Sequence, residues 1–175
     1  ALTSAGTPCI SYYDYTNGNL KYAAYSGSAW TIQTVDSAGD VGLYTSLTLN
    51  DYGEPCISYY DQTNGDLKYA VHAPSGWTIQ TVDSAGDVGQ YLSLARDYAD
   101  EPCISYFDAT NYRLKYAVFN GAVWQIQTVD AAGFAGMYTS LAMDIYGRPR
   151  ISCYDMTNAN LLYAAYNSSA WQIQT

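Results

Sequence analysis

The chain has 175 residues, of which 49% are hydrophobic and only 13% are charged, and it contains 20 tyrosines. This length and apolar content are sufficient for a domain with its own core. The formal net charge of −9 includes only seven Lys and Arg residues, too few for the basic clusters that bind nucleic acid. No apolar run approaches the roughly 20 residues of a membrane helix. No basic segment followed by an apolar one opens the chain, so we expect no signal peptide within it.

One stretch recurs through the whole sequence. It reads PCISYYDQTNGDLKYA at residues 55–70 and returns, with changes, at residues 8–23, 102–117 and 149–164. The step is 47 residues each time (8 to 55, 55 to 102, 102 to 149), and Trp30, Trp77, Trp124 and Trp171 keep it. A fixed period of this size indicates a repeat architecture. We therefore expect a single repeat domain over residues 1–175, with units at about 1–36, 44–83, 91–130 and 138–175.

Each repeat predicts four strands, because its apolar residues alternate with a period of two. In the second copy, residues 44–51 predict an inner strand with Leu47 and Leu49 on one face. Residues 56–61 (CISYYD) are apolar on both sides, as in a strand buried on both faces. Asn64-Gly65 predicts a type I′ hairpin, followed by strands at 67–72 and 77–83. The Gly-containing residues 84–90 lead to the next copy.

Four consecutive antiparallel strands per repeat, without a helical segment, describe a propeller blade. The recurring patterns are S-L-x-x-D-x-x-G-x-P, I-S-Y-Y-D, N-G-x-L-K-Y-A and W-x-I-Q-T. On these motifs the whole chain resembles the β-propeller repeat superfamily, and it is similar in style to short, aromatic-rich lectin propellers. The resemblance implies an all-β fold of four four-stranded antiparallel blades. A β-solenoid is the alternative, which the Asn-Gly hairpin disfavours.

The two ends leave the closure of the propeller open. Ala1 aligns with Thr48 inside an inner strand, and Thr175 aligns with Thr128 inside an outer strand. One interpretation is a closed four-bladed ring. The other is part of a longer array, or of a larger ring completed by a second chain.

The four cysteines admit two interpretations. Cys9, Cys56 and Cys103 share one repeat position, whereas Cys153 replaces a repeated tyrosine. Strand parity directs Cys103 and Cys153 to opposite faces of their blades, so a disulfide between these two neighbours, or Cys9–Cys153 in a closed ring, is one hypothesis. Buried free thiols are the favoured one. No tetrahedral metal site is expected from thiols on separate blades.

The repeated aspartates before each hairpin suggest a structural role. Asp61 with Asp66 resembles an oxygen-rich calcium loop, but the third copy places Arg113 at the second position. A side-chain bond from the aspartate to the turn backbone is the favoured interpretation. We therefore expect no cofactor, and calcium is disfavoured.

Catalytic signals are weak in the sequence. His72, the single histidine, occupies a position that is aromatic in the other copies, and the repeated serines have no histidine to activate them. No carboxylate pair differs from its repeat-related copies. We therefore expect the protein not to be an enzyme. The blade-specific charges are Arg96, Arg113, Arg148 and Arg150. Arg96 is the first to mutate, because it replaces an apolar inner-strand residue.

The aromatic residues give the candidate site. Tyr44, Tyr91 and Tyr138 are expected in the connecting loops between blades, with Asp40 and Asp87 nearby. Tyrosine offers a flat apolar face and a polar tip, so these clefts suit stacking of a sugar ring. Alternatively, the tyrosines only cover the packing between blades. In the third connection Phe134 replaces the aspartate, and the site there is not equivalent.

Three functions follow as hypotheses. The first is a secreted or extracellular recognition module, lectin-like, that binds glycan or another extracellular ligand between blades. The second is an assembly subunit that self-associates into larger rings or filaments through its terminal strands. The third and least favoured is a hydrolase-type propeller enzyme. Asn167-Ser168-Ser169 is a glycosylation sequon if the chain is secreted.

Overall fold

The computed structural model describes residues 1–130 and 133–175. These residues form fifteen β-strands in four antiparallel sheets, one sheet for each repeat. Within these two ranges there is no helix long and apolar enough to cross a membrane. The expected all-β fold of consecutive antiparallel blades is confirmed.

The sheets follow one another in chain order. The first holds β1 (Cys9–Asp14), β2 (Asn19–Tyr25) and β3 (Trp30–Asp36). The second holds β4 (Val41–Leu49), β5 (Pro55–Asp61), β6 (Asp66–Ala73) and β7 (Gly76–Asp83). The third holds β8 (Val88–Arg96), β9 (Pro102–Asp108), β10 (Arg113–Phe119) and β11 (Trp124–Asp130). The fourth holds β12 (Ala135–Met143), β13 (Pro149–Asp155), β14 (Asn160–Tyr166) and β15 (Trp171–Gln174). Before β1, an isolated bridge between Leu2 and Pro8 stands where the other sheets have an inner strand.

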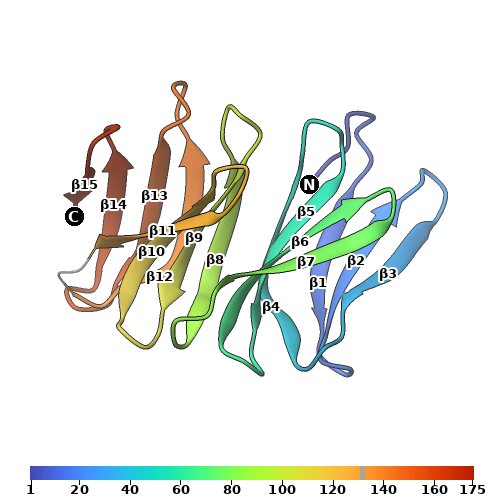
Figure 1. Cartoon of the computed structure of the whole chain (residues 1–175), viewed down its shortest axis with the longest axis horizontal. Coiled ribbons are helices and arrows are strands. Elements are labelled where there is room, and N and C mark those ends of the chain that lie inside the picture. The colour runs from blue at the N-terminus through green and yellow to red at the C-terminus, as the bar shows by residue number, and fades with distance from the viewer. Residues whose placement is uncertain (131–132) are drawn as a thin grey trace.

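The four sheets stack in an open row rather than a closed ring (Figure 1). The first and last sheets lie at opposite ends of the long axis, and the inner strands β4, β8 and β12 contact one another in sequence. The described residues therefore do not close into a four-bladed ring.

The inner strand starts three residues earlier than expected. β4 begins at Val41, and its pairing with β5 shifts register between Leu43 and Ser46. This bulge lies at Tyr44, whose φ is 54°. β8 and β12 repeat the irregularity at Tyr91 (φ 52°) and Tyr138 (φ 55°). The prediction that these tyrosines lie in the connecting loops is wrong, since they lie within the inner strands.

The hairpin after β5 also differs from the predicted type I′ turn. Four residues separate the paired Asp61 and Asp66, and in this loop only Gly65 has a positive φ, 74°. The Gly65 N–H donates to the Asp61 carbonyl at 2.8 Å. The Asp61 carboxylate accepts from the Asn64 backbone at 3.1 Å and from its side-chain amide at 2.8 Å, so the predicted side-chain bond from aspartate to the turn is confirmed.

The core lies between the sheets in three clusters, one for each pair of neighbours. All seven residues of β9 are buried, and six of the seven in β5, which confirms that the middle strands are covered on both faces. Close approach requires glycine where each inner strand crosses the preceding sheet, as at Gly89. A Cβ on Gly89 would meet the Leu67 backbone at 2.8 Å, because β8 crosses the start of β6 there.

All four cysteines are free and buried. Cys103 and Cys153 belong to the same core cluster between the third and fourth sheets. Strand parity thus places them correctly in one interface, but the hypothesis of a disulfide between them is wrong. Burial raises the pKa of the Cys103 thiol to about 12 and that of Cys153 to about 11, so both behave as small apolar side chains.

Candidate functional site

Each joint between neighbouring sheets is held by the same three side chains. A tyrosine of one sheet meets the edge of a tryptophan of the next at 5.4–5.5 Å between ring centroids, and the indole Nε1 donates to a glutamine of the first sheet at 2.9–3.1 Å. The three sets are Tyr22, Trp77 and Gln33; Tyr69, Trp124 and Gln80; and Tyr116, Trp171 and Gln127. Because these contacts recur at each of the three joints, aromatic side chains border the space between every pair of neighbouring sheets.

The joint between the third and fourth sheets opens into a cleft of about 240 Å³. Its aromatic wall comes from Tyr116 on β10, Tyr166 on β14 and Trp171 on β15, with the rings of Tyr166 and Trp171 5.3 Å apart. Gly147 and Arg148 of the β12–β13 turn and Pro149 at the start of β13 also line it. A cleft with aromatic faces and few polar groups suits a small polar ligand that also has an apolar face.

Arg148 contributes a positive charge to this cleft, and Asp144 fixes the position of its guanidinium. The Asp144 carboxylate accepts from Arg148 Nε at 2.8 Å and from Arg150 Nη2 at 2.5 Å. Although desolvation opposes ionisation, hydrogen bonds from Arg148 and from the turn backbone hold the pKa of Asp144 well below its usual range. The carboxylate therefore stays charged at neutral pH, and Arg148 keeps its orientation over the Tyr146 ring, 4.8 Å from the centroid.

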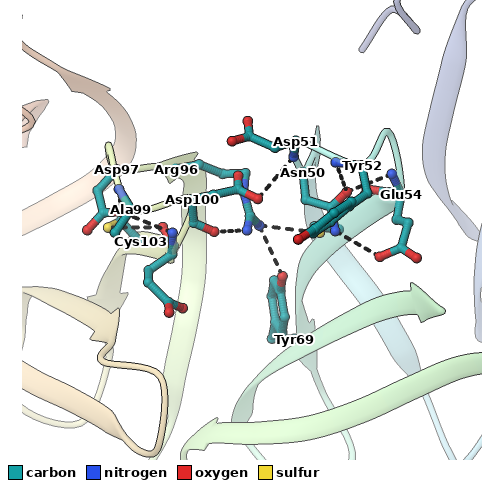
Figure 2. A network of polar contacts seen from close by, with 12 residues as sticks. Asn50, Asp51, Tyr52, Glu54, Tyr69, Arg96, Asp97, Ala99, Asp100 and Cys103 are labelled. Carbon is teal, nitrogen blue, oxygen red and sulfur yellow. Dashed lines mark hydrogen bonds and ion pairs between the residues drawn. The ribbon is translucent and has the colours of Figure 1, made fainter.

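The corresponding space between the second and third sheets is filled by Arg96. Figure 2 shows its guanidinium bonded to Asp100 and directed toward Tyr69. Arg96 Nη1 lies 3.4 Å from Tyr69 Oη and 3.4 Å from Cys56 Sγ. Asp100 has a φ of 60°, where the neighbouring copies have glycine, and it accepts from the Asp51 N–H of the adjacent turn at 3.0 Å. Desolvation disfavours the charge on Arg96, but the bond to Asp100 raises its pKa. Arg96 thus ties two sheets together rather than standing free in a site.

The predicted site tyrosines form a continuous row along the inner strands. Tyr44 and Tyr91 lie 4.6 Å apart between ring centroids, as do Tyr91 and Tyr138. Burial and a hydrogen bond with Tyr44 raise the pKa of Tyr91, and Tyr138 is the most exposed of the three. The sequence places each tyrosine in its own cleft between blades, whereas the structure brings the three rings into contact with one another.

The predicted aspartates have a structural role. Tyr13 donates to Asp40 at 2.5 Å, and Tyr60 donates to Asp87 at 2.7 Å. Burial and the bond to Asp87 raise the pKa of Tyr60 to about 12, so the phenol remains a donor. Each pair fastens a middle strand to the connection that leads to the next sheet.

The third connection keeps this contact in apolar form. Phe107 replaces the tyrosine and Phe134 replaces the aspartate, and Tyr112 lies between them with ring centroids at 6.4 Å and 4.3 Å. Both polar partners are exchanged together, so no carboxylate at this place is left facing an apolar ring. The loss of the aspartate at position 134 is therefore compensated by the loss of the tyrosine hydroxyl at position 107.

Sequence reasoning singled out Arg148 as a blade-specific charge but did not place it in a cleft, and it missed the aromatic wall beside it. The signal was present, because Arg148 stands where the two preceding copies have Glu54 and Glu101. Tyr116, Tyr166 and Trp171 gave no such signal, since their counterparts are aromatic in the other copies.

The fold has known counterparts, although no family model and no curated protein sequence matches the chain. A fucose lectin from Kordia zhangzhouensis in complex with methyl-fucoside has a TM-score of 0.55 at 14% identity, over 75% of this chain and 97% of the lectin. An ulvan lyase of a polysaccharide lyase family has a TM-score of 0.64 at 13% identity, over 99% of this chain and 56% of that one. An exo-β-1,3-galactanase from Phanerochaete chrysosporium has a TM-score of 0.61 at 12% identity, over 99% and 51%. The chain spans about half the length of these two enzymes.

These structures correct one expectation and establish another. The expectation that the protein is not an enzyme is wrong, because carbohydrate-active enzymes share this architecture with the lectin. The lack of a serine–histidine pair therefore does not argue against catalysis on this fold. The fold itself is established: the chain is a β-propeller-type array of four sheets.

Proposed function

We propose that the chain binds carbohydrate in the cleft between its third and fourth sheets. The observation that carries the proposal is one cleft lined both by the aromatic rings of Tyr166 and Trp171 and by Arg148, whose guanidinium Asp144 fixes. A sugar ring has an apolar face that stacks on an aromatic ring, and its hydroxyls accept hydrogen bonds from a guanidinium. A lectin and carbohydrate-active enzymes with the same fold support this ligand class.

The joints between the other sheets supply a natural comparison. Glu101 occupies the position of Arg148 in the joint that Arg96 fills. We therefore expect the cleft beside Arg148 to be the principal site.

The test is binding to a glycan array, followed by calorimetric titration of the strongest ligand. Arg148→Glu restores the residue type of the other copies, and Tyr166→Ala removes a stacking surface. We expect each to weaken binding at least about tenfold, which corresponds to a loss of about 1.4 kcal/mol. Glu101→Ala, at the matched position of the closed joint, is the control and leaves the affinity unchanged.

The same titrated samples are assayed for new reducing ends, which would reveal cleavage of the bound carbohydrate. No carbohydrate bound at millimolar concentration, or wild-type affinity in both cleft variants, would overturn the proposal.

A further inference from the structure

The last sheet has an outer face that the other sheets bury. Leu161 on β14 is 70% exposed, whereas its counterparts Leu20, Leu67 and Leu114 are 0% exposed. Tyr163 is 38% exposed, whereas the equivalent tyrosines of the joints are buried. This face therefore carries the apolar residues of a joint without a sheet packed on them.

The first sheet has the opposite face of a joint, also uncovered. Ile10 on β1 is 47% exposed, whereas Ile57, Ile104 and Ile151 at the same position are 0% exposed. Trp30 is 45% exposed, and its counterparts Trp77, Trp124 and Trp171 are the indoles that close the three joints. Among the described residues, no side chain accepts a hydrogen bond from the Trp30 Nε1.

The two faces hold complementary halves of one contact set. Tyr163 and Gln174 of the last sheet stand at the positions of Tyr116 and Gln127, the two residues that receive Trp171. Trp30 of the first sheet is the indole that such a pair receives. The complete set occurs at three joints within the chain, and the residues of a fourth set are divided between the first and the last sheet.

We propose that a second copy of this chain packs its first sheet onto the last sheet of the first copy, and forms a fourth joint of the same kind. Trp30 of one copy meets the edge of Tyr163 and donates Nε1 to Gln174 of the other, while Ile10 and Leu161 become buried. The contact joins two different faces, so it is head-to-tail, and repetition closes a ring or extends a filament. The inference is independent of carbohydrate binding.

Two single-face variants test the proposal. Leu161→Arg blocks the last face and Ile10→Arg blocks the first, and both side chains are exposed enough to accept a charge without unfolding the chain. Analytical ultracentrifugation and native mass spectrometry measure the species of the wild type, of each variant and of their equimolar mixture. We expect concentration-dependent oligomers for the wild type, monomers for each variant alone, and a 1:1 dimer for the mixture, which can grow no further.

The mixture distinguishes a head-to-tail joint from other association. A wild type that stays monomeric at every concentration, or a mixture that stays monomeric, overturns the proposal. So does a single variant that dimerises as strongly as the wild type, because that result means the same face pairs with itself. Trp30→Phe removes the Nε1 donor and is expected to weaken wild-type assembly several-fold. Tyr52→Ala, at an exposed tyrosine of the β4–β5 turn, is expected to leave assembly unchanged.

Discussion

At the scale of the residue, Ser58 and Ser105 show how one neighbour decides whether a buried hydroxyl stabilises the fold. Both serines are fully buried at the same repeat position. Ser105 Oγ donates to Thr139 on the next inner strand at 2.9 Å. The counterpart of Thr139 beside Ser58 is Leu92, and Ser58 Oγ has no partner among the described residues. A buried hydroxyl without a partner destabilises the folded state.

Replacing the two serines should therefore have opposite effects. We expect Ser58→Ala to raise the free energy of unfolding by about 1 kcal/mol, because it removes an unsatisfied polar group. Ser105→Ala should lower it by about 1 kcal/mol, because it breaks a bond and leaves Thr139 with fewer partners. Urea denaturation of both variants measures the difference, and equal losses in both would contradict this reading.

At the scale of the element, the joints contain buried ion pairs as well as aromatic contacts. Lys115 on β10 lies 2.6 Å from Asp83, at the end of β7, and 3.6 Å from Asp108. Tyr106 also donates to Asp83, at 2.7 Å. Burial opposes ionisation of Asp83, but the bonds from Lys115 and Tyr106 lower its pKa on balance. The lysine therefore bridges carboxylates from neighbouring sheets and favours the charged form of Asp83 in the interface.

This arrangement sets the pH dependence of stability. The pKa of Asp83 is lower in the folded state than the value of about 3.9 of an unfolded chain. The contribution of charged Asp83 to the free energy of unfolding is therefore complete above about pH 3.9, and it is lost as the pH falls through the folded-state pKa. Lys115→Met should raise the pKa of Asp83, so the free energy of unfolding should begin to fall at a higher pH. At neutral pH the variant should be less stable than the wild type by about 3–5 kcal/mol, because the buried carboxylate loses its partner. Denaturation between pH 7 and pH 3 measures both effects.

Lys21→Met is the matched control for that measurement. Lys21 holds the same repeat position in the first sheet, but its ammonium lies 3.8 Å from Asp14 on a more exposed surface. The pKa of Asp14 is lowered chiefly by its hydrogen bond from Asn17. We therefore expect a much smaller change, and an equal shift in both variants would argue against a special role for the joint.

The sequence predicts elements well where the signal is local. Alternation of apolar residues and the turn residues Gly53 and Pro55 locate the strands of each repeat to within a few residues. The bulge at Tyr44 escapes this reasoning, because an irregular register depends on how β4 crosses the sheet behind it. The cleft beside Arg148 escapes it for a similar reason, since its width depends on whether a residue such as Arg96 fills the joint.

At the scale of the whole molecule, the open row makes burial depend on the position of a sheet. The sequence could not predict this, because the angle between sheets follows from the packing of inner strands and not from the pattern within a repeat. The middle sheets are covered on both faces and the end sheets on one. The same residue at the same repeat position therefore contributes a different amount to the free energy of unfolding in different repeats.

Substitutions of Ile10 on β1 and Ile104 on β9 test this difference in stability. Ile104→Ala in the third sheet should cost about 2–5 kcal/mol, because the side chain is fully buried and leaves a cavity. Ile10→Ala at the same position of the first sheet should cost less than about 1 kcal/mol in the monomer, since Ile10 is half exposed. Thermal and urea denaturation at low protein concentration compare the two.

The paired exchange of Phe107 and Phe134 has a consequence for how such a chain can be recombined. Asp87 lies in the connection that precedes the third sheet, yet it binds Tyr60 of the second. A 47-residue unit that begins with a connection, such as residues 84–130, contains Asp87 without Tyr60, and placed after the third sheet it would set the Asp87 carboxylate against Phe107. A unit that consists of a sheet and the connection after it, such as residues 44–90, contains both partners. The unit that can be moved without loss of this contact is therefore a sheet together with the connection that follows it.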